Sequence, residues 1–167
     1  MFDPEWKEGC PSCSMAADHF DGSAIHLAQR DVTFTAISRA PLAQIEAFQK
    51  RMGWRFPWVS SFGTDFNHDY CVSFTKDELA SGKVYNFGTA GFPSEEAPGL
   101  SVFYREGNGE IFHTYWTYGR GLEDLLGVYT FLDRSPKGRD DEGLPHPMGW
   151  VRHQDRYSDG RLVSLGR

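Results

Sequence analysis

A pair of cysteines separated by two residues, Cys10-Pro11-Ser12-Cys13, lies close to the start of the chain and constrains both fold and chemistry. Two thiols at this spacing can close a small disulfide or bind a soft metal ion. In redox proteins such a pair follows a buried strand and opens a helix, so that the first thiol lies at the helix N-terminus. We therefore predict an α/β fold in which a helix begins at this motif.

The segment after the cysteines has the pattern helix, strand, helix. Apolar residues on one face predict a helix over Met15–Arg30, which Asp21-Gly22-Ser23 is expected to bend or interrupt. The β-branched run Val32–Ile37 predicts a buried strand. A second helix follows Pro41 and carries apolar residues at helical spacing until Gly53 ends it.

The remaining chain predicts further strands, a hairpin and a last helix. An apolar stripe in Gly121–Leu132 predicts a helix that packs on the sheet. The other expected elements are strands at Trp58–Ser61 and Tyr70–Phe74, one or two helical turns at Lys76–Ser81, and hairpin strands at Leu100–Arg105 and Glu110–Trp116. Cys71 falls within the second strand, so we expect it to be a buried core residue.

In this order the elements predict a thioredoxin-like α/β sandwich, with a central mixed sheet flanked by helices. Such a sandwich has a strand directly before the cysteine pair, whereas residues 1–9 hold a proline and several charged side chains. We therefore expect the first strand to be missing. A homodimer partner, a swapped segment or a rearranged sheet would then cover the gap. Residues 1–134 form the thioredoxin-like domain, and residues 135–167 form a loop and tail packed on it.

The expected helix N-terminus favours a thiolate at Cys10, because its free N–H groups and partial positive charge stabilise an anion. Cys10 is thus the predicted nucleophile. Cys13, one turn further on and more buried, is the thiol that resolves the mixed disulfide. Two alternatives stay open: a zinc site that recruits Cys71, His19 or His26, for which no spacing template exists, and a pair of unreactive thiols. No metal or other cofactor is predicted.

Three further residues are candidates for positioning a substrate. Pro98 precedes the first hairpin strand, where thioredoxin-like proteins carry a cis-proline whose neighbouring backbone pairs with the substrate; an ordinary trans-proline is the alternative. Arg39 ends a predicted strand at the sheet edge where ligands gather, and it either stabilises the thiolate or pairs with Asp31 or Asp18. Trp6 flanks the cysteines and could shield them.

The composition limits the partners. A net charge of −6, from 17 basic and 23 acidic residues without a basic run, argues against nucleic-acid and membrane-surface binding. No apolar stretch approaches the roughly 20 residues that span a bilayer, and the N-terminus lacks the pattern of a signal peptide. We therefore expect a cytoplasmic protein, and in that compartment a C-x-x-C motif is catalytic or metal-binding.

Longer runs of the chain resemble one bacterial family. These runs are GCPSCS at 9–14, RDVTFTAISRAPL at 30–42, RMGWRFPWVSS at 51–61, DFNHDY at 65–70, FPSEEAPGLSVFYR at 92–105, HTYWTYGRGLE at 113–123 and LDRSPKGRDDEGLP at 132–145. The family is catalogued as domain of unknown function 899. The resemblance implies a thioredoxin fold, a dithiol–disulfide oxidoreductase activity and a redox pair at Cys10 and Cys13. Family members carry a strand before this motif, and Met1 falls where that strand should end.

The pattern and the resemblance together lead us to expect a thiol–disulfide oxidoreductase that uses Cys10 and Cys13. Its partner would be a protein or a small thiol that exchanges electrons with this pair. Two other functions stay open: a non-catalytic thioredoxin-like binding module, and a thiol peroxidase in which peroxide oxidises Cys10 to sulfenic acid.

Overall fold

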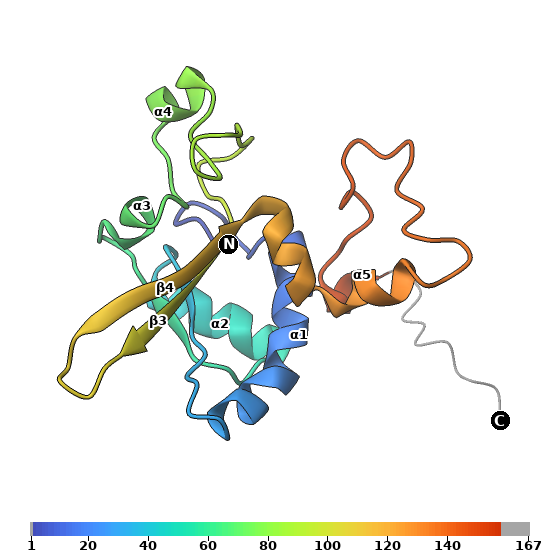
Figure 1. Ribbon diagram of the computed structural model, residues 1–167. Coiled ribbons are helices and arrows are strands. Elements are labelled where there is room, and N and C mark those ends of the chain that lie inside the picture. Colours follow the sequence, from blue (N-terminus) through green and yellow to red (C-terminus); the bar gives the residue numbers. More distant parts are fainter. Residues whose placement is uncertain (1, 158–167) are drawn as a thin grey trace.

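The computed structural model describes residues 2–157 and has the mixed α/β composition that the sequence predicts (Figure 1). The helices are α1 (Pro11–Ala28), α2 (Leu42–Met52), α3 (Phe66–Asp69), α4 (Lys76–Ser81) and α5 (Gly127–Leu132), with 3₁₀ turns η1 (Gly119–Leu125) and η2 (Gln154–Arg156). The strands are β1 (Ala36–Ser38), β2 (Trp58–Ser60), β3 (Gly99–Arg105) and β4 (Ile111–Tyr118). Among these residues, no helix combines the length and the apolar character needed to cross a membrane.

Helix α1 begins directly at the cysteine motif, as predicted. Pro11 occupies the first helical position, where its fixed φ suits the helix and its missing N–H costs no hydrogen bond. The expected interruption at Asp21-Gly22-Ser23 is wrong, because α1 runs through these residues. The Asp21 carboxylate accepts hydrogen bonds from the backbone N–H of Arg55 at 2.5 Å and from its guanidinium at 2.8 and 2.9 Å. That side chain is therefore engaged outside the helix and does not compete with the helical backbone.

Strands β1 and β2 pair in parallel, with α2 as their connection and Ser38 opposite Ser60. Strand β1 covers three residues and is shorter than the predicted Val32–Ile37 strand. The N–H of Val32 instead bonds to the Leu27 carbonyl at the end of α1, and the Val32 side chain is 45% exposed. Gly53 ends α2, as predicted, with a φ of 74° that glycine adopts without strain.

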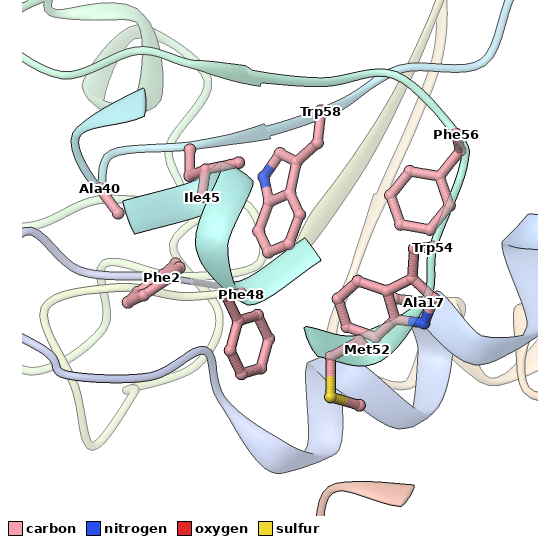
Figure 2. Packing of buried hydrophobic residues seen from close by; sticks show 9 residues of the cluster. All are labelled: Phe2, Ala17, Ala40, Ile45, Phe48, Met52, Trp54, Phe56 and Trp58. Atoms are coloured by element: carbon pink, nitrogen blue, oxygen red, sulfur yellow. The ribbon is translucent and has the colours of Figure 1, made fainter. Parts of the chain in front are cut away.

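An aromatic core joins α1, α2 and the β1–β2 sheet (Figure 2). The Phe48 ring packs edge-on against Phe2, Trp54 and Trp58, with centroid distances of 5.5, 5.7 and 6.2 Å. The buried members of this core are Phe2, Ala17, Ala40, Ile45, Phe48, Met52, Trp54, Phe56 and Trp58. Ala17 belongs to α1, so the helix that carries both cysteines is packed on this core.

Strands β3 and β4 form the predicted antiparallel hairpin, which extends away from the helices (Figure 1). Its ladder skips Thr114, the extra residue of a β-bulge in β4. In residues 2–157 this hairpin and the β1–β2 pair are separate two-stranded sheets, so the single central sheet that we predicted is not formed. No strand of this described region pairs with both β1 and β3, and large apolar side chains of the hairpin stay exposed, including Tyr104 and Ile111.

The predicted strand Tyr70–Phe74 is wrong, and with it the predicted burial of Cys71. Helix α3 ends before this segment, and Cys71 is exposed with a φ of 53°, in the left-handed region. Only Ser73 forms an isolated bridge, to Glu96. The left-handed residue turns the chain sharply and prevents the extended backbone that a strand requires.

The predicted helix Gly121–Leu132 is divided at Leu126, whose φ of −107° and ψ of 76° separate η1 from α5. Leu126 and Tyr129 of its apolar stripe are buried, but they pack with Met15 of α1 and with Val151 instead of on the predicted sheet. Val151 lies in the C-terminal segment, so the described part of that segment packs on the rest of the chain. The last ten residues of the predicted tail, 158–167, lie outside the described residues.

Candidate functional site

Cys10 and Cys13 lie together at the start of α1. Cys10 is the residue directly before the helix, and Cys13 is in the first turn. The Cys10 carbonyl accepts hydrogen bonds from both the backbone N–H and the hydroxyl of Ser14, each at 2.9 Å. This pair of bonds anchors the first turn, which directs unpaired backbone N–H groups toward the Cys10 sulfur.

The surroundings of Cys10 strongly favour its thiolate. The pKa of Cys10 is lowered from 9.0 to about 6, chiefly because the Cys13 thiol donates a hydrogen bond to its sulfur. Burial acts in the opposite direction, and hydrogen bonds from the backbone N–H groups of Cys13 and Ser12 lower the pKa further. The helix start thus contributes through discrete N–H donors as well as through its dipole.

Cys13 is the complementary member of the pair. Its pKa is raised well above the ordinary value because its thiol is held as the donor to Cys10, because it is buried, and because of the negative charge on Cys10. The two causes that involve Cys10 exist only while that sulfur is ionised. One thiolate and one protonated thiol therefore share the site.

A narrow cavity of about 10 Å³ adjoins Cys13, a volume that holds no more than about one water molecule. Its lining consists of the helix start and aromatic core residues, namely Gly9, Cys13, Ser14, Ala17, Phe20, Ala36, Trp54, Phe56 and Trp58. A substrate disulfide cannot enter a space of this size, and both cysteines are half-buried.

Arg39 has a different partner from those that we predicted. Its guanidinium binds the Glu96 carboxylate at 2.6 Å, and the Glu96 side chain is only 1% exposed. The Ser73 hydroxyl also donates to Glu96, at 2.7 and 2.8 Å to its two oxygens. Arg39 therefore neutralises a buried carboxylate, and neither Asp31 nor Asp18 is its partner. This ion pair ties the end of β1 to the segment before β3.

Pro98 lies before β3, as predicted, but its peptide bond is trans. The Pro98 carbonyl accepts a hydrogen bond from the Tyr85 hydroxyl at 2.5 Å, and that hydroxyl accepts one from the Gly119 N–H at 2.7 Å. Burial is the main cause that raises the pKa of Tyr85 to about 12. Tyr85 is therefore a protonated donor to the Pro98 carbonyl.

Trp6 packs against the aromatic core, and shielding of the thiols by its ring stays a prediction. A second neighbour of the site, His153, was not predicted from the sequence. Its Nε2–H donates to the carbonyl of Gly9, the residue before Cys10, at 2.8 Å. His153 and Gly9 are 144 positions apart. The only sequence feature at that point of the C-terminal segment is the histidine itself, which lies among Gly, Pro and charged residues.

The residues proposed for a zinc site do not assemble. Both ring nitrogens of His19 are engaged, Nδ1 with the Met15 carbonyl at 2.7 Å and Nε2 with the Val128 N–H at 3.1 Å. His26 is exposed on α1, and Cys71 is exposed after α3. Across residues 2–157, no three His, Cys, Asp or Glu side chains cluster in a way that could hold a metal ion.

Together the fold and the site define an α/β protein with a dithiol at a helix N-terminus, in which one sulfur is ionised and the other protonated. The chain matches the family described as bacterial protein of unknown function (DUF899) over residues 1–157, and it belongs to that family. Searches of curated proteins and of solved structures found no match.

Proposed function

We propose that the protein is a thioredoxin-like thiol–disulfide oxidoreductase with Cys10 as its nucleophile and Cys13 as its resolving thiol. The observation that carries the proposal is the placement of both thiols at the start of α1, with Cys10 directly before the helix and Cys13 in its first turn, where the pKa of Cys10 is lowered to about 6. At that pKa about nine-tenths of Cys10 is thiolate at pH 7, against a few per cent for a free cysteine. The mixed α/β fold, with a parallel β1–α2–β2 unit and a separate hairpin, supports the fold assignment.

In the first step the Cys10 thiolate attacks one sulfur of a substrate disulfide. A bond forms between Cys10 and that sulfur while the substrate S–S bond breaks, and the second substrate sulfur leaves as a thiolate. The product is a mixed disulfide in which Cys10 carries no charge.

Loss of that charge prepares the second step. The Cys10 sulfur no longer carries the negative charge that accepts a hydrogen bond from the Cys13 thiol and opposes its ionisation, so two causes of the raised Cys13 pKa disappear. Cys13 gives its proton to the departed thiolate and attacks Cys10. The Cys10–Cys13 disulfide forms, and the first substrate sulfur leaves as a thiolate. Two electrons have then passed from the dithiol to the substrate.

Glutathione disulfide tests this sequence in a Cys71→Ser background, which removes the exposed third thiol. We expect the protein to end as the internal Cys10–Cys13 disulfide, measured by intact mass after alkylation of free thiols. The Cys13→Ser variant should stop as a mixed disulfide between glutathione and Cys10, and the Cys10→Ser variant should stay unreacted. An unreacted parent protein, or equal adduct formation by the Cys10→Ser variant, contradicts the proposal.

A thiol peroxidase is a second candidate, favoured by the same low Cys10 pKa. In that reaction Cys10 takes an oxygen from peroxide to become sulfenic acid and releases hydroxide, and Cys13 then displaces water to form the disulfide. A dimedone adduct on Cys10 in the Cys13→Ser variant, formed at low peroxide concentration, identifies this activity. A non-catalytic binding module would instead bind its partner equally well in the Cys10→Ser and Cys13→Ser variants.

A further inference from the structure

The C-terminal segment returns to the residues just before the dithiol. His153 is 3% exposed, and its ring packs edge-on against Phe48 with a centroid distance of 5.2 Å. Its Nε2 lies 2.8 Å from the Gly9 carbonyl oxygen. His153 therefore connects a residue of the aromatic core (Figure 2) to the peptide that leads into Cys10.

The hydrogen bonds of His153 define the orientation of its ring. A carbonyl oxygen only accepts, so Nε2 carries the hydrogen that bonds to Gly9. Nδ1 is then an acceptor, and the Arg51 guanidinium approaches it at 3.4 Å. Glu8 lies on the same side, with Oε2 3.6 Å from Nδ1. With a partner at each nitrogen and Phe48 against its face, the ring has one favoured placement.

A cluster of ion pairs near the surface stabilises the contact between His153 and Gly9. Arg51 of α2 binds Glu8 at 3.0 Å and Asp155 at 2.7 and 2.9 Å. Arg156 binds the two oxygens of Glu8 at 2.5 and 2.7 Å. Single pairs at a partly exposed surface contribute little, but this network joins α2, the segment before Cys10 and the C-terminal segment at one place.

Gly9 is confined from a second direction. A Cβ atom at this position would lie 2.8 Å from Cε1 of Phe48, so the backbone of Gly9 is packed directly against the ring. The Gly9 peptide is therefore held between Phe48 on one side and the Nε2–H of His153 on the other. Cys10 follows immediately, with a φ of −57° and a ψ of 129° that direct the chain into α1.

We propose that His153 is a positioning residue for Cys10, because it fixes the Gly9 carbonyl and with it the place of the Cys10 sulfur at the start of α1. The groups that favour the Cys10 thiolate, the Cys13 thiol and the N–H groups of Cys13 and Ser12, belong to α1. The sulfur that they stabilise belongs to the residue before the helix. A shift of the Gly9 peptide therefore moves the acceptor away from donors that stay in place. The proposal rests on the redox role of Cys10, and it makes the C-terminal segment part of the dithiol site.

Two substitutions of His153 separate its hydrogen bond from its packing, again in the Cys71→Ser background. His153→Phe keeps an aromatic ring against Phe48 but has no donor for the Gly9 carbonyl. His153→Gln restores an N–H donor and loses the ring. Gln154→Ala is the matched control, because Gln154 donates to the Met52 carbonyl at 2.6 Å and leaves Gly9 untouched.

The measurement is the rate of iodoacetamide alkylation of Cys10 against pH, together with the thermal unfolding midpoint. Below the pKa of Cys10 the rate follows the thiolate fraction. We expect His153→Phe to lower it about twofold at pH 5.5, since loss of one aligned hydrogen bond lowers the thiolate fraction there about fourfold while the higher pKa raises the nucleophilicity of the thiolate about twofold. His153→Gln should recover part of the rate. Gln154→Ala should lower the unfolding midpoint without moving the pH profile.

A wild-type pH profile in His153→Phe overturns the proposal, as does an equal displacement of the profile in Gln154→Ala. Should His153→Phe fail to fold, Gly9→Ala displaces the same peptide from the Phe48 side, and it should lower the rate in the same way. The redox role is judged separately, by glutathione disulfide exchange of the parent protein. An altered profile in a protein that does not exchange disulfides supports positioning and refutes the redox function.

Discussion

Replacement of Cys13 by alanine tests the central hydrogen bond of the site. The Cys13 thiol is the largest cause of the low Cys10 pKa of about 6. A hydrogen bond to a charged group contributes about 1.5–3 kcal/mol, which corresponds to a pKa change of about 1–2. We therefore expect Cys13→Ala to raise the pKa of Cys10 by that amount. The thiolate fraction at pH 7 then falls from about nine-tenths to between about one-half and one-tenth.

The assay is again alkylation of Cys10 across pH in the Cys71→Ser background, read by intact mass. The midpoint of the Cys13→Ala rate profile should lie about 1–2 pH units above that of the parent protein. Cys13→Ser is the matched control, because its hydroxyl still donates, and its profile should lie between the other two. The N–H groups of Ser12 and residue 13 remain in every variant and keep the pKa below that of a free thiol. An unchanged profile in Cys13→Ala would refute the reasoning.

Four further outcomes are expected. Arg39→Ala leaves the Glu96 carboxylate buried without its cation, so it should lower the free energy of urea unfolding by about 2–4 kcal/mol, and adding Glu96→Gln should recover part of that loss. Slower Cys10 alkylation at an unchanged free energy of unfolding would instead mean that Arg39 stabilises the thiolate. Ile45→Ala, at a fully buried position, should lower the free energy of unfolding by about 2–5 kcal/mol, and a decrease of less than about 1 kcal/mol would contradict the packing of Ile45 in the core. Because the folded pKa of Cys10 lies below that of an unfolded thiol, the reduced protein should gain stability from about pH 6 to about pH 9. The raised pKa of Cys13 should lower stability again above about pH 9, and urea midpoints that match Cys10→Ser throughout would contradict both effects. The dithiol potential in glutathione buffers should be less negative than the roughly −270 mV of thioredoxin, and a more negative value would contradict the stabilised thiolate.

Features that depend on neighbouring residues could be predicted from the sequence. The start of α1 at the C-x-x-C motif needs only Pro11 and the helical residues that follow, and the end of α2 needs only Gly53. The hairpin follows from its Gly-rich turn and its β-forming flanks. The lowered pKa of Cys10 likewise follows from its place at the helix start, while its catalytic role stays a prediction.

Contacts between distant segments could not be predicted in this way. Arg39 and Glu96 are 57 positions apart, and nothing in the sequence distinguishes Glu96 from the other carboxylates that could pair with that guanidinium. The contact of His153 with Gly9 depends on the path of the whole C-terminal segment. All residues of the Val32–Ile37 run favour a strand, but the N–H of Val32 bonds to the end of α1 instead. Tertiary contacts override the strand propensity there.

A Cys10 pKa of about 6 also bears on the direction of exchange. At pH 7 such a thiol holds about 30-fold more thiolate than one of pKa 8.5, but its intrinsic nucleophilicity is lower by about 13-fold, for a Brønsted coefficient near 0.45. The gain for Cys10 as an attacking group is therefore only about twofold. As a leaving group Cys10 has no such offset, because a low pKa speeds its release from a mixed disulfide and stabilises the reduced product. The electrostatics therefore favour the reverse of the two steps proposed above, in which the Cys10–Cys13 disulfide accepts electrons from a dithiol substrate.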